Sequence, residues 1–245
     1  SCVLYLHIYF MEDIMQVLIE KELNSTDKIL KPDFNSKTGR ELLAFYLQAK
    51  FRQILAFDKR CNSGVFNDVN PNFINRFSKR LINNPKKRML IGITGESACG
   101  KSTVCSIIKS VIERLSMPVT VLSTDNYFND ISKLIKEYGS FDKLRDSGYD
   151  VDAPESFQLD VLSEDLKKLS FGEDITAPMY LPNGTGVSIS NAQEVKSEKI
   201  IVVEGIATMY KDVRDIFDIK IYIEADNNIR KNRFMTRACD ERNQS

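Results

Sequence analysis

Residues 95–103 read Gly95-Glu96-Ser97-Ala98-Cys99-Gly100-Lys101-Ser102-Thr103, which fits the pattern G-x-x-x-x-G-K-[S/T] of a phosphate-binding loop. This loop directly follows a short apolar run over residues 89–93. It directly precedes residues 104–115, whose apolar side chains recur at helical spacing. Strand, loop and helix in this order are the context that the motif requires, so residues 89–115 predict a phosphate-binding strand–helix unit.

The residue types of the loop indicate how it would hold a nucleotide. Gly95 and Gly100 permit backbone angles that turn successive N–H groups inward on an anion, and the N-terminus of the next helix adds its positive dipole. Lys101 is placed to reach the β- and γ-phosphates, and the Ser102 hydroxyl to bind Mg²⁺. Since the chain carries no N/T-K-x-D motif for reading guanine, we expect all nine residues to form an ATP site.

Further apolar runs predict the rest of the fold. Besides residues 89–93, short runs over residues 119–122, 199–203 and 219–223 read as strands, and helical patterns separate them. Strands that alternate with helices predict an α/β fold, a P-loop NTPase-type doubly wound parallel sheet. A polar hinge before Arg88 divides this domain, residues 88–245, from residues 1–87, which we expect to form a helical N-terminal appendage.

The role of the N-terminal region stays open. Apolar faces at helical spacing over residues 11–86 are typical of helices that pack on a main domain, and binding a partner or dimerising is the less favoured alternative. Residues 1–10 begin with Ser1 and are strongly apolar. Two interpretations remain for them, a native start or a non-native leader.

Composition excludes several classes of function. The chain has 245 residues with 34 basic and 34 acidic side chains, so no net charge attracts nucleic acid or a membrane surface. No apolar run approaches the roughly 18 residues of a membrane span. Five cysteines without CxxC spacing favour the reducing cytoplasm. His7 is the only histidine, so acid–base chemistry must fall to carboxylates.

Two carboxylates follow predicted strands. Asp125 comes after the run over residues 119–122, and Glu204 ends the run over residues 199–203. Because the carboxyl ends of parallel strands meet at one edge of the sheet, we expect both side chains near the γ-phosphate. One carboxylate would take the proton of an acceptor hydroxyl while others hold Mg²⁺.

With these pieces in order, residues 88–245 resemble the uridine kinase and phosphoribulokinase family of P-loop kinases. The resemblance rests on the phosphate loop, on Thr124-Asp125 with its following aromatics, and on four further segments. These segments are Tyr149-Asp150-Val151-Asp152-Ala153-Pro154-Glu155-Ser156-Phe157, Ala177-Pro178-Met179-Tyr180, Val203-Glu204-Gly205-Ile206 and Ile223-Glu224-Ala225-Asp226.

The resemblance implies a role for each matching residue. Asp125 corresponds to the general base, and it shares the Mg²⁺ shell with Ser102 and Glu204. Asp152 corresponds to the Asp that contacts ribose hydroxyls. The remaining assignments are Tyr180, Tyr127 and Arg233 for acceptor binding, and Lys101, Arg237 and Arg242 for catalysis. Guanidinium groups suit a transition state that spreads negative charge.

The sequence departs from the family at several points. Uridine kinases carry a His shortly after the pocket Tyr, whereas residues 181–186 contain none, so uridine follows from the resemblance alone. Phe234 and Gln244 replace other family residues. The family continues beyond the position of Ser245, so we expect a domain truncated at its C-terminus.

The sequence thus predicts an ATP- and Mg²⁺-dependent kinase for a hydroxyl of a small-molecule acceptor, a nucleoside such as uridine. Two alternatives stay open, a pantothenate or sugar-phosphate kinase and a non-catalytic ATP-responsive interaction module. No nucleic-acid or membrane partner is expected, and a homo-oligomer is left open.

Overall fold

The computed structural model describes residues 33–61, 78–83, 88–114, 117–181, 185–225, 227–228 and 230–231. Several residues singled out in the sequence lie outside these ranges, namely residues 1–10, Arg233, Phe234, Arg237, Arg242, Gln244 and Ser245. The chain divides into two compact units, residues 1–84 with 110–117, and residues 85–109 with 118–245. Each unit is described by itself.

The first unit is built on the helix α2, Lys37–Cys61. Its start is fixed by Ser36, whose hydroxyl accepts from the N–H of Gly39 at 2.9 Å. Leu43 and Leu47 are fully buried along the helix. Gln48 donates from its side-chain amide to the Ser78 hydroxyl at 2.6 Å, so the helical residues 78–82 lie beside α2. The helical character expected for this region is present in these two segments.

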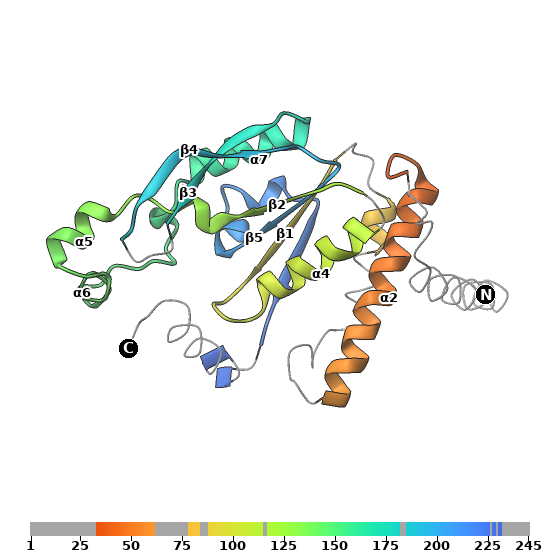
Figure 1. Ribbon diagram of the computed structural model, residues 1–245, viewed down its shortest axis with the longest axis horizontal. Helices are drawn as coiled ribbons and strands as arrows, with labels where there is room; N and C mark the ends of the chain where they lie inside the picture. The colour runs from red at the N-terminus through yellow and green to blue at the C-terminus, as the bar shows by residue number, and fades with distance from the viewer. Residues whose placement is uncertain are drawn as a thin grey trace. The chain divides into compact units, whose positions relative to one another are not determined.

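The second unit contains a parallel four-stranded sheet in the order β2-β5-β1-β6 (Figure 1). Its strands are β1 (Met89–Gly95), β2 (Val119–Ser123), β5 (Ile200–Glu204) and β6 (Ile219–Ile223). The side chains of β1 are buried along its whole length, as expected for a strand covered on both faces. The predicted α/β fold with a parallel central sheet is confirmed.

Helices cover the two faces of this sheet. Figure 1 shows α7 (Leu159–Phe171) on one side and α4 (Lys101–Arg114), which directly follows the phosphate loop, on the other. On the α7 side, Leu90, Leu122 and Ile201 of the sheet share a buried apolar cluster with Leu162 and Leu166 of the helix. This core fixes the strand ends that carry the candidate site.

An antiparallel hairpin lies beside α7 (Figure 1). Its strands are β3 (Ile175–Tyr180) and β4 (Ser188–Val195), with a register shift between Ala177 and Met179. The remaining elements are the helices α5 (Ser132–Tyr138) and α6 (Phe141–Asp146), and the 3₁₀ turns η1 (Thr124–Tyr127), η2 (Pro154–Ser156), η3 (Ile206–Met209) and η4 (Arg214–Ile216). Among the described residues, no helix combines the length and apolar character needed to cross a bilayer.

Candidate functional site

The phosphate loop adopts a backbone that few side chains tolerate. Gly95 and Gly100 have φ values of +147° and +106°, and Ala98 between them has +61°. A Cβ on Gly95 would stand 2.2 Å from the carbonyl oxygen of Ile223, so this position requires glycine. At Gly95 the loop is therefore packed tightly against the end of β6. At Gly100 there is space, because an added Cβ would meet nothing within 4 Å.

Lys101 begins α4 and folds back over the loop. Its ammonium group donates to the carbonyl oxygens of Gly95 at 2.9 Å and Glu96 at 3.0 Å. The helix continues from there, with the N–H of Val104 donating to the carbonyl of Gly100 at 3.1 Å. A fixed positive charge thus lies at the helix N-terminus, where an anion is stabilised.

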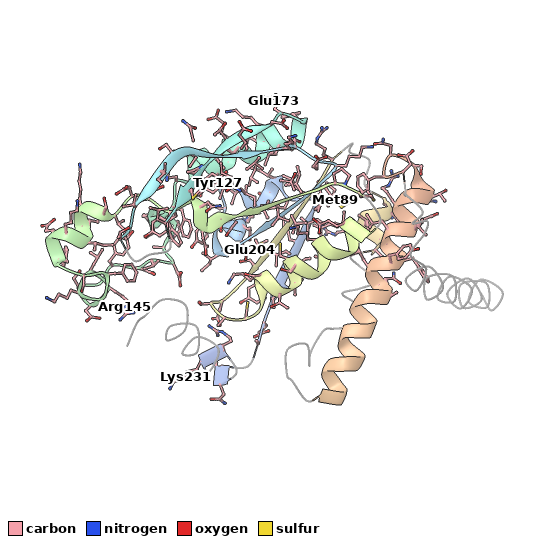
Figure 2. The ribbon with its side chains drawn as sticks, viewed as in Figure 1. Met89, Tyr127, Arg145, Glu173, Glu204 and Lys231 are labelled. Atoms are coloured by element: carbon pink, nitrogen blue, oxygen red, sulfur yellow. The ribbon has the colours of Figure 1, made fainter. Side chains whose placement is uncertain are left out.

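Glu204 connects the phosphate loop to the neighbouring strand end. It lies at the carboxyl end of β5 (Figure 2). One carboxylate oxygen accepts from the Ser102 hydroxyl at 3.4 Å, and the other accepts from the Ser123 hydroxyl at 3.1 Å. The carboxylate therefore faces the loop, as the position after a buried strand predicted.

Asp125 lies in η1, two residues after the end of β2. Its N–H donates to the Ser123 hydroxyl at 3.3 Å, and the register of β2 with β5 pairs Ser123 with Glu204. Ser123 thus joins the Asp125 backbone to the Glu204 carboxylate. Sequence reasoning missed Ser123, although a hydroxyl residue directly before the Thr-Asp pair was a usable signal.

The side chains at this site fit a magnesium ion that takes some of its ligands from the protein and the others from a bound nucleotide and water. Glu204 supplies a carboxylate and Ser102 a hydroxyl, and both are hard oxygen ligands. Within the described ranges, no group of three or more His, Cys, Asp or Glu could hold a metal ion alone. Mg²⁺ characteristically takes one or two carboxylates and completes its shell with phosphates and water.

Cys105 lies buried near this carboxylate. Burial, and then the charge of Glu204, raises the pKa of its thiol to about 11. The thiol therefore stays neutral at physiological pH and offers no thiolate ligand or nucleophile.

Three aromatic rings pack together around Phe128. Phe128 stacks on Phe157, with ring centroids 4.2 Å apart, and lies 5.2 Å from the ring of Tyr180. Tyr180 ends β3 and is half-buried. Burial, then the neighbouring Tyr149 and Asp130, raises the pKa of the Tyr180 hydroxyl, so it remains a protonated donor.

Tyr127 does not belong to this aromatic group. Its side chain is fully buried, and its hydroxyl donates to the Asp165 carboxylate on α7 at 2.9 Å. Burial, reinforced by Asp165, raises the pKa of Tyr127. The expectation that Tyr127 binds the acceptor is therefore corrected, because a side chain without exposed surface cannot contact a ligand. Phe128, the next residue, instead packs against Phe157 and Tyr180.

Asp152 lies in the turn that precedes η2. Burial, and then the Asp150 carboxylate, raises the pKa of the Asp152 carboxyl, and the positive charge of Lys101 offsets part of this rise. The Lys101 ammonium, whose charge opposes this rise, belongs to the phosphate loop. The N–H of Asp152 donates to the Asp150 carboxylate at 2.9 Å, which orders the turn.

An ion pair that the sequence did not predict crosses the phosphate loop. The Arg230 guanidinium pairs with the Glu96 carboxylate, and its Nε donates to the Ser97 carbonyl at 3.2 Å. Arg230 also donates to the Asn227 side chain at 3.0 Å. A cation from the segment after β6 is therefore held at the loop by an acidic loop residue.

Several known kinases are similar to this chain in sequence. A uridine kinase of Clostridium tetani is 34% identical over 165 residues, which cover 65% of this chain and 72% of that protein. A uridine kinase of Staphylococcus aureus is 36% identical over 162 residues, covering 65% and 73%. Uridine-cytidine kinase A of Dictyostelium discoideum is 32% identical over 161 residues, and this chain spans 30% of its length.

A solved structure shows the same fold. It comes from a Silicibacter species, is provisionally named a fructose transport system kinase, and superposes with a TM-score of 0.55 at 21% identity. The match covers 68% of this chain and 79% of that one. The sequence profile of the Phosphoribulokinase / Uridine kinase family matches residues 90–245, well over half of the chain. The chain therefore belongs to the phosphoribulokinase and uridine kinase family of kinases.

Proposed function

We propose that this protein transfers a phosphoryl group from ATP, in the presence of Mg²⁺, to a hydroxyl of a nucleoside such as uridine. The observation that carries the proposal is the Glu204 carboxylate, which accepts from Ser102 of the phosphate loop and from Ser123 beside Asp125. This carboxylate joins the loop that suits a triphosphate to the candidate base.

The nucleotide half of the site uses the loop residues Gly95 to Thr103, with Lys101 as the fixed cation. Ser102 and Glu204, with Asp125 nearby, would hold Mg²⁺. When bound, Mg²⁺ neutralises negative charge on the transferred phosphoryl group. The loop amides and the Lys101 ammonium stabilise the same negative charge.

The acceptor half uses Asp125 as the base. Its carboxylate takes the proton that the acceptor hydroxyl loses as the new O–P bond forms. Asp152 and Tyr180 position the acceptor, and the half-buried ring of Phe128, which stacks on the buried Phe157, offers a face for a planar base. The names of the curated relatives support a nucleoside over a sugar phosphate or pantothenate.

Other parts of the proposal rest on the family resemblance. Arg233 is assigned to acceptor binding, and Arg237 and Arg242 to neutralising transition-state charge. Cys99 and Cys105 are free thiols, which favours the cytoplasm as the compartment. Self-association stays open.

The acceptor class is tested with γ-labelled ATP and a panel of uridine, cytidine, adenosine, pantothenate, fructose 6-phosphate and ribulose 5-phosphate. We expect label in uridine and cytidine and none in the other products. A matched reaction with EDTA should lose transfer. Label in a sugar phosphate or pantothenate would move the protein to another branch of the family. ATP binding without transfer to any acceptor would favour the interaction module instead.

Glu96→Gln should tighten ATP binding about two- to fivefold at low salt. The substitution removes a negative charge from the phosphate loop and releases Arg230 to face the triphosphate. The gain is modest because the Glu96 side chain is 60% exposed, and exposed pairs contribute roughly 0–1 kcal/mol.

Calorimetric titrations at about 50 mM and 500 mM salt check this result, since screening should erase the gain at the higher concentration. Glu194→Gln, an exposed position on β4, is the matched control and should change nothing. Weaker ATP binding by Glu96→Gln would instead show that the pair supports the loop.

A further inference from the structure

We propose that Tyr210 is a positioning residue for acceptor binding, because its hydroxyl holds the turn that carries Asp152. The inference rests on the proposed function, in which Asp152 binds the acceptor. The Tyr210 hydroxyl donates to the backbone carbonyl of Asp152 across 58 positions of sequence. The contact joins the segment after Glu204 to the acceptor turn.

Tyr210 stands on a well-fixed backbone. It follows η3, which begins directly after the Glu204-Gly205 pair, and the N–H of Gly205 donates to the carbonyl of Ile93 in β1 at 3.0 Å. The Tyr210 N–H donates to the Ala207 carbonyl at 3.2 Å, and its own carbonyl accepts from the N–H of Val213 at 3.0 Å. These main-chain hydrogen bonds therefore fix the position of Tyr210 relative to the carboxyl end of β5.

The ring of Tyr210 is also oriented by packing. It meets Phe157 edge-on, with centroids 5.7 Å apart at 72°, and Phe157 stacks on Phe128. Burial, followed by the charges of Asp152, Asp150 and Glu155, raises the pKa of Tyr210 to about 12. Its hydroxyl thus keeps the proton that it donates throughout the neutral range.

At its Asp152 end the turn has a hydrogen bond of its own, from the N–H of Asp152 to the Asp150 carboxylate. Its far end is held by Asn129, which donates from its side chain to the Glu155 carbonyl at 2.8 Å and from its backbone to the Ser156 carbonyl at 2.9 Å. Within the turn, Ser156 donates to the Asp150 carbonyl at 2.7 Å. The bond from Tyr210 attaches the Asp152 end to the segment that follows β5 and η3.

Tyr210→Phe tests the inference, with Tyr222→Phe as the matched control because Tyr222 is 65% exposed on β6. Loss of one neutral hydrogen bond should raise the acceptor KM about three- to tenfold. KM for ATP and kcat should stay within about twofold, since the hydroxyl acts on acceptor binding alone. Amide hydrogen exchange over residues 150–153 should accelerate, and Tyr222→Phe should change none of these values.

A double-mutant cycle separates positioning from general packing. In the Asp152→Asn background, Tyr210→Phe should raise the acceptor KM less than about twofold, because the group that it positions is already disabled. An equal increase in both backgrounds, a parallel rise in the KM for ATP, or unchanged exchange over residues 150–153 would each overturn the inference.

The exchange measurement also separates this inference from the proposed function. It uses the full chain without substrate, so it remains decisive if the wild-type protein phosphorylates no nucleoside. In that case the proposed function fails. Faster exchange in Tyr210→Phe would still uphold the support of the turn, and unchanged exchange would refute it.

Discussion

Asp125→Asn should lower turnover by about 10²–10⁴-fold while ATP affinity stays within about twofold. The size of the effect is that of removing a general base. An amide of the same shape cannot take the proton of the acceptor hydroxyl. The backbone N–H of Asp125, which donates to the Ser123 hydroxyl, is untouched, so the Ser123–Glu204 contact should survive.

Steady-state transfer to uridine and calorimetric ATP titration measure the two quantities separately. Asp212→Asn is the matched control, because Asp212 is an exposed residue of the same unit, and it should behave as wild type. Turnover close to wild type in Asp125→Asn would remove Asp125 as the base. Turnover and ATP affinity that fall together would show that Asp125 acts through the metal shell and not as the base.

The sheet and the phosphate loop could be predicted because their signals are local. In β5, four consecutive residues are buried before Glu204, so the sequence shows an unbroken apolar run with a carboxylate at its end. The same holds for β1, whose run leads directly into the loop. The position of Glu204 at the sheet edge follows from the parallel arrangement alone.

The hairpin was not predicted because it lacks such a signal. Most side chains of β4 are exposed or half-buried, so they show no alternation of apolar and polar residues. The strand β3 contains Pro178, which argues against a strand in a sequence. The pairing of the two strands becomes visible only in three dimensions.

Which of the two aromatic residues after Asp125 is buried, Tyr127 or Phe128, also depended on the fold. Both follow Asp125, but Tyr127 ends a 3₁₀ turn, in which successive side chains point about 120° apart. One aromatic residue therefore enters the core while its neighbour meets Phe157. The contact of Ser123 with Glu204, 81 positions apart, likewise requires the register of β2 with β5.

Gly205→Ala should destabilise the protein by about 2–5 kcal/mol and remove measurable turnover. Gly205 has φ +135° and ψ 172°, a region that residues other than glycine occupy at a cost of about 1–3 kcal/mol. An added Cβ would stand 1.9 Å from the Thr124 hydroxyl oxygen, and overpacking adds about 1–3 kcal/mol. Thermal unfolding should show a Tm lower by about 5–15 °C.

The loss of turnover follows from where the clash occurs. Gly205 directly follows Glu204, and Thr124 directly precedes Asp125, so separating the two backbones moves the two carboxylates apart. Gly148→Ala is the matched control, because Gly148 has a φ of +101° with nothing within 4 Å of the added Cβ. Gly148→Ala should lose stability only through the unfavourable backbone conformation, because it adds no clash, and the variant should keep its activity.

Thr124→Ala supplies the second half of a double-mutant cycle. The buried Thr124 hydroxyl has no hydrogen-bond partner among the described residues, so deleting it should cost little by itself. Combined with Gly205→Ala, it should recover about 1–3 kcal/mol of stability, because the hydroxyl is the atom closest to the new Cβ. Additive losses in the double variant would show that the cost of Gly205→Ala comes from backbone strain at residue 205 and not from contact with the Thr124 hydroxyl.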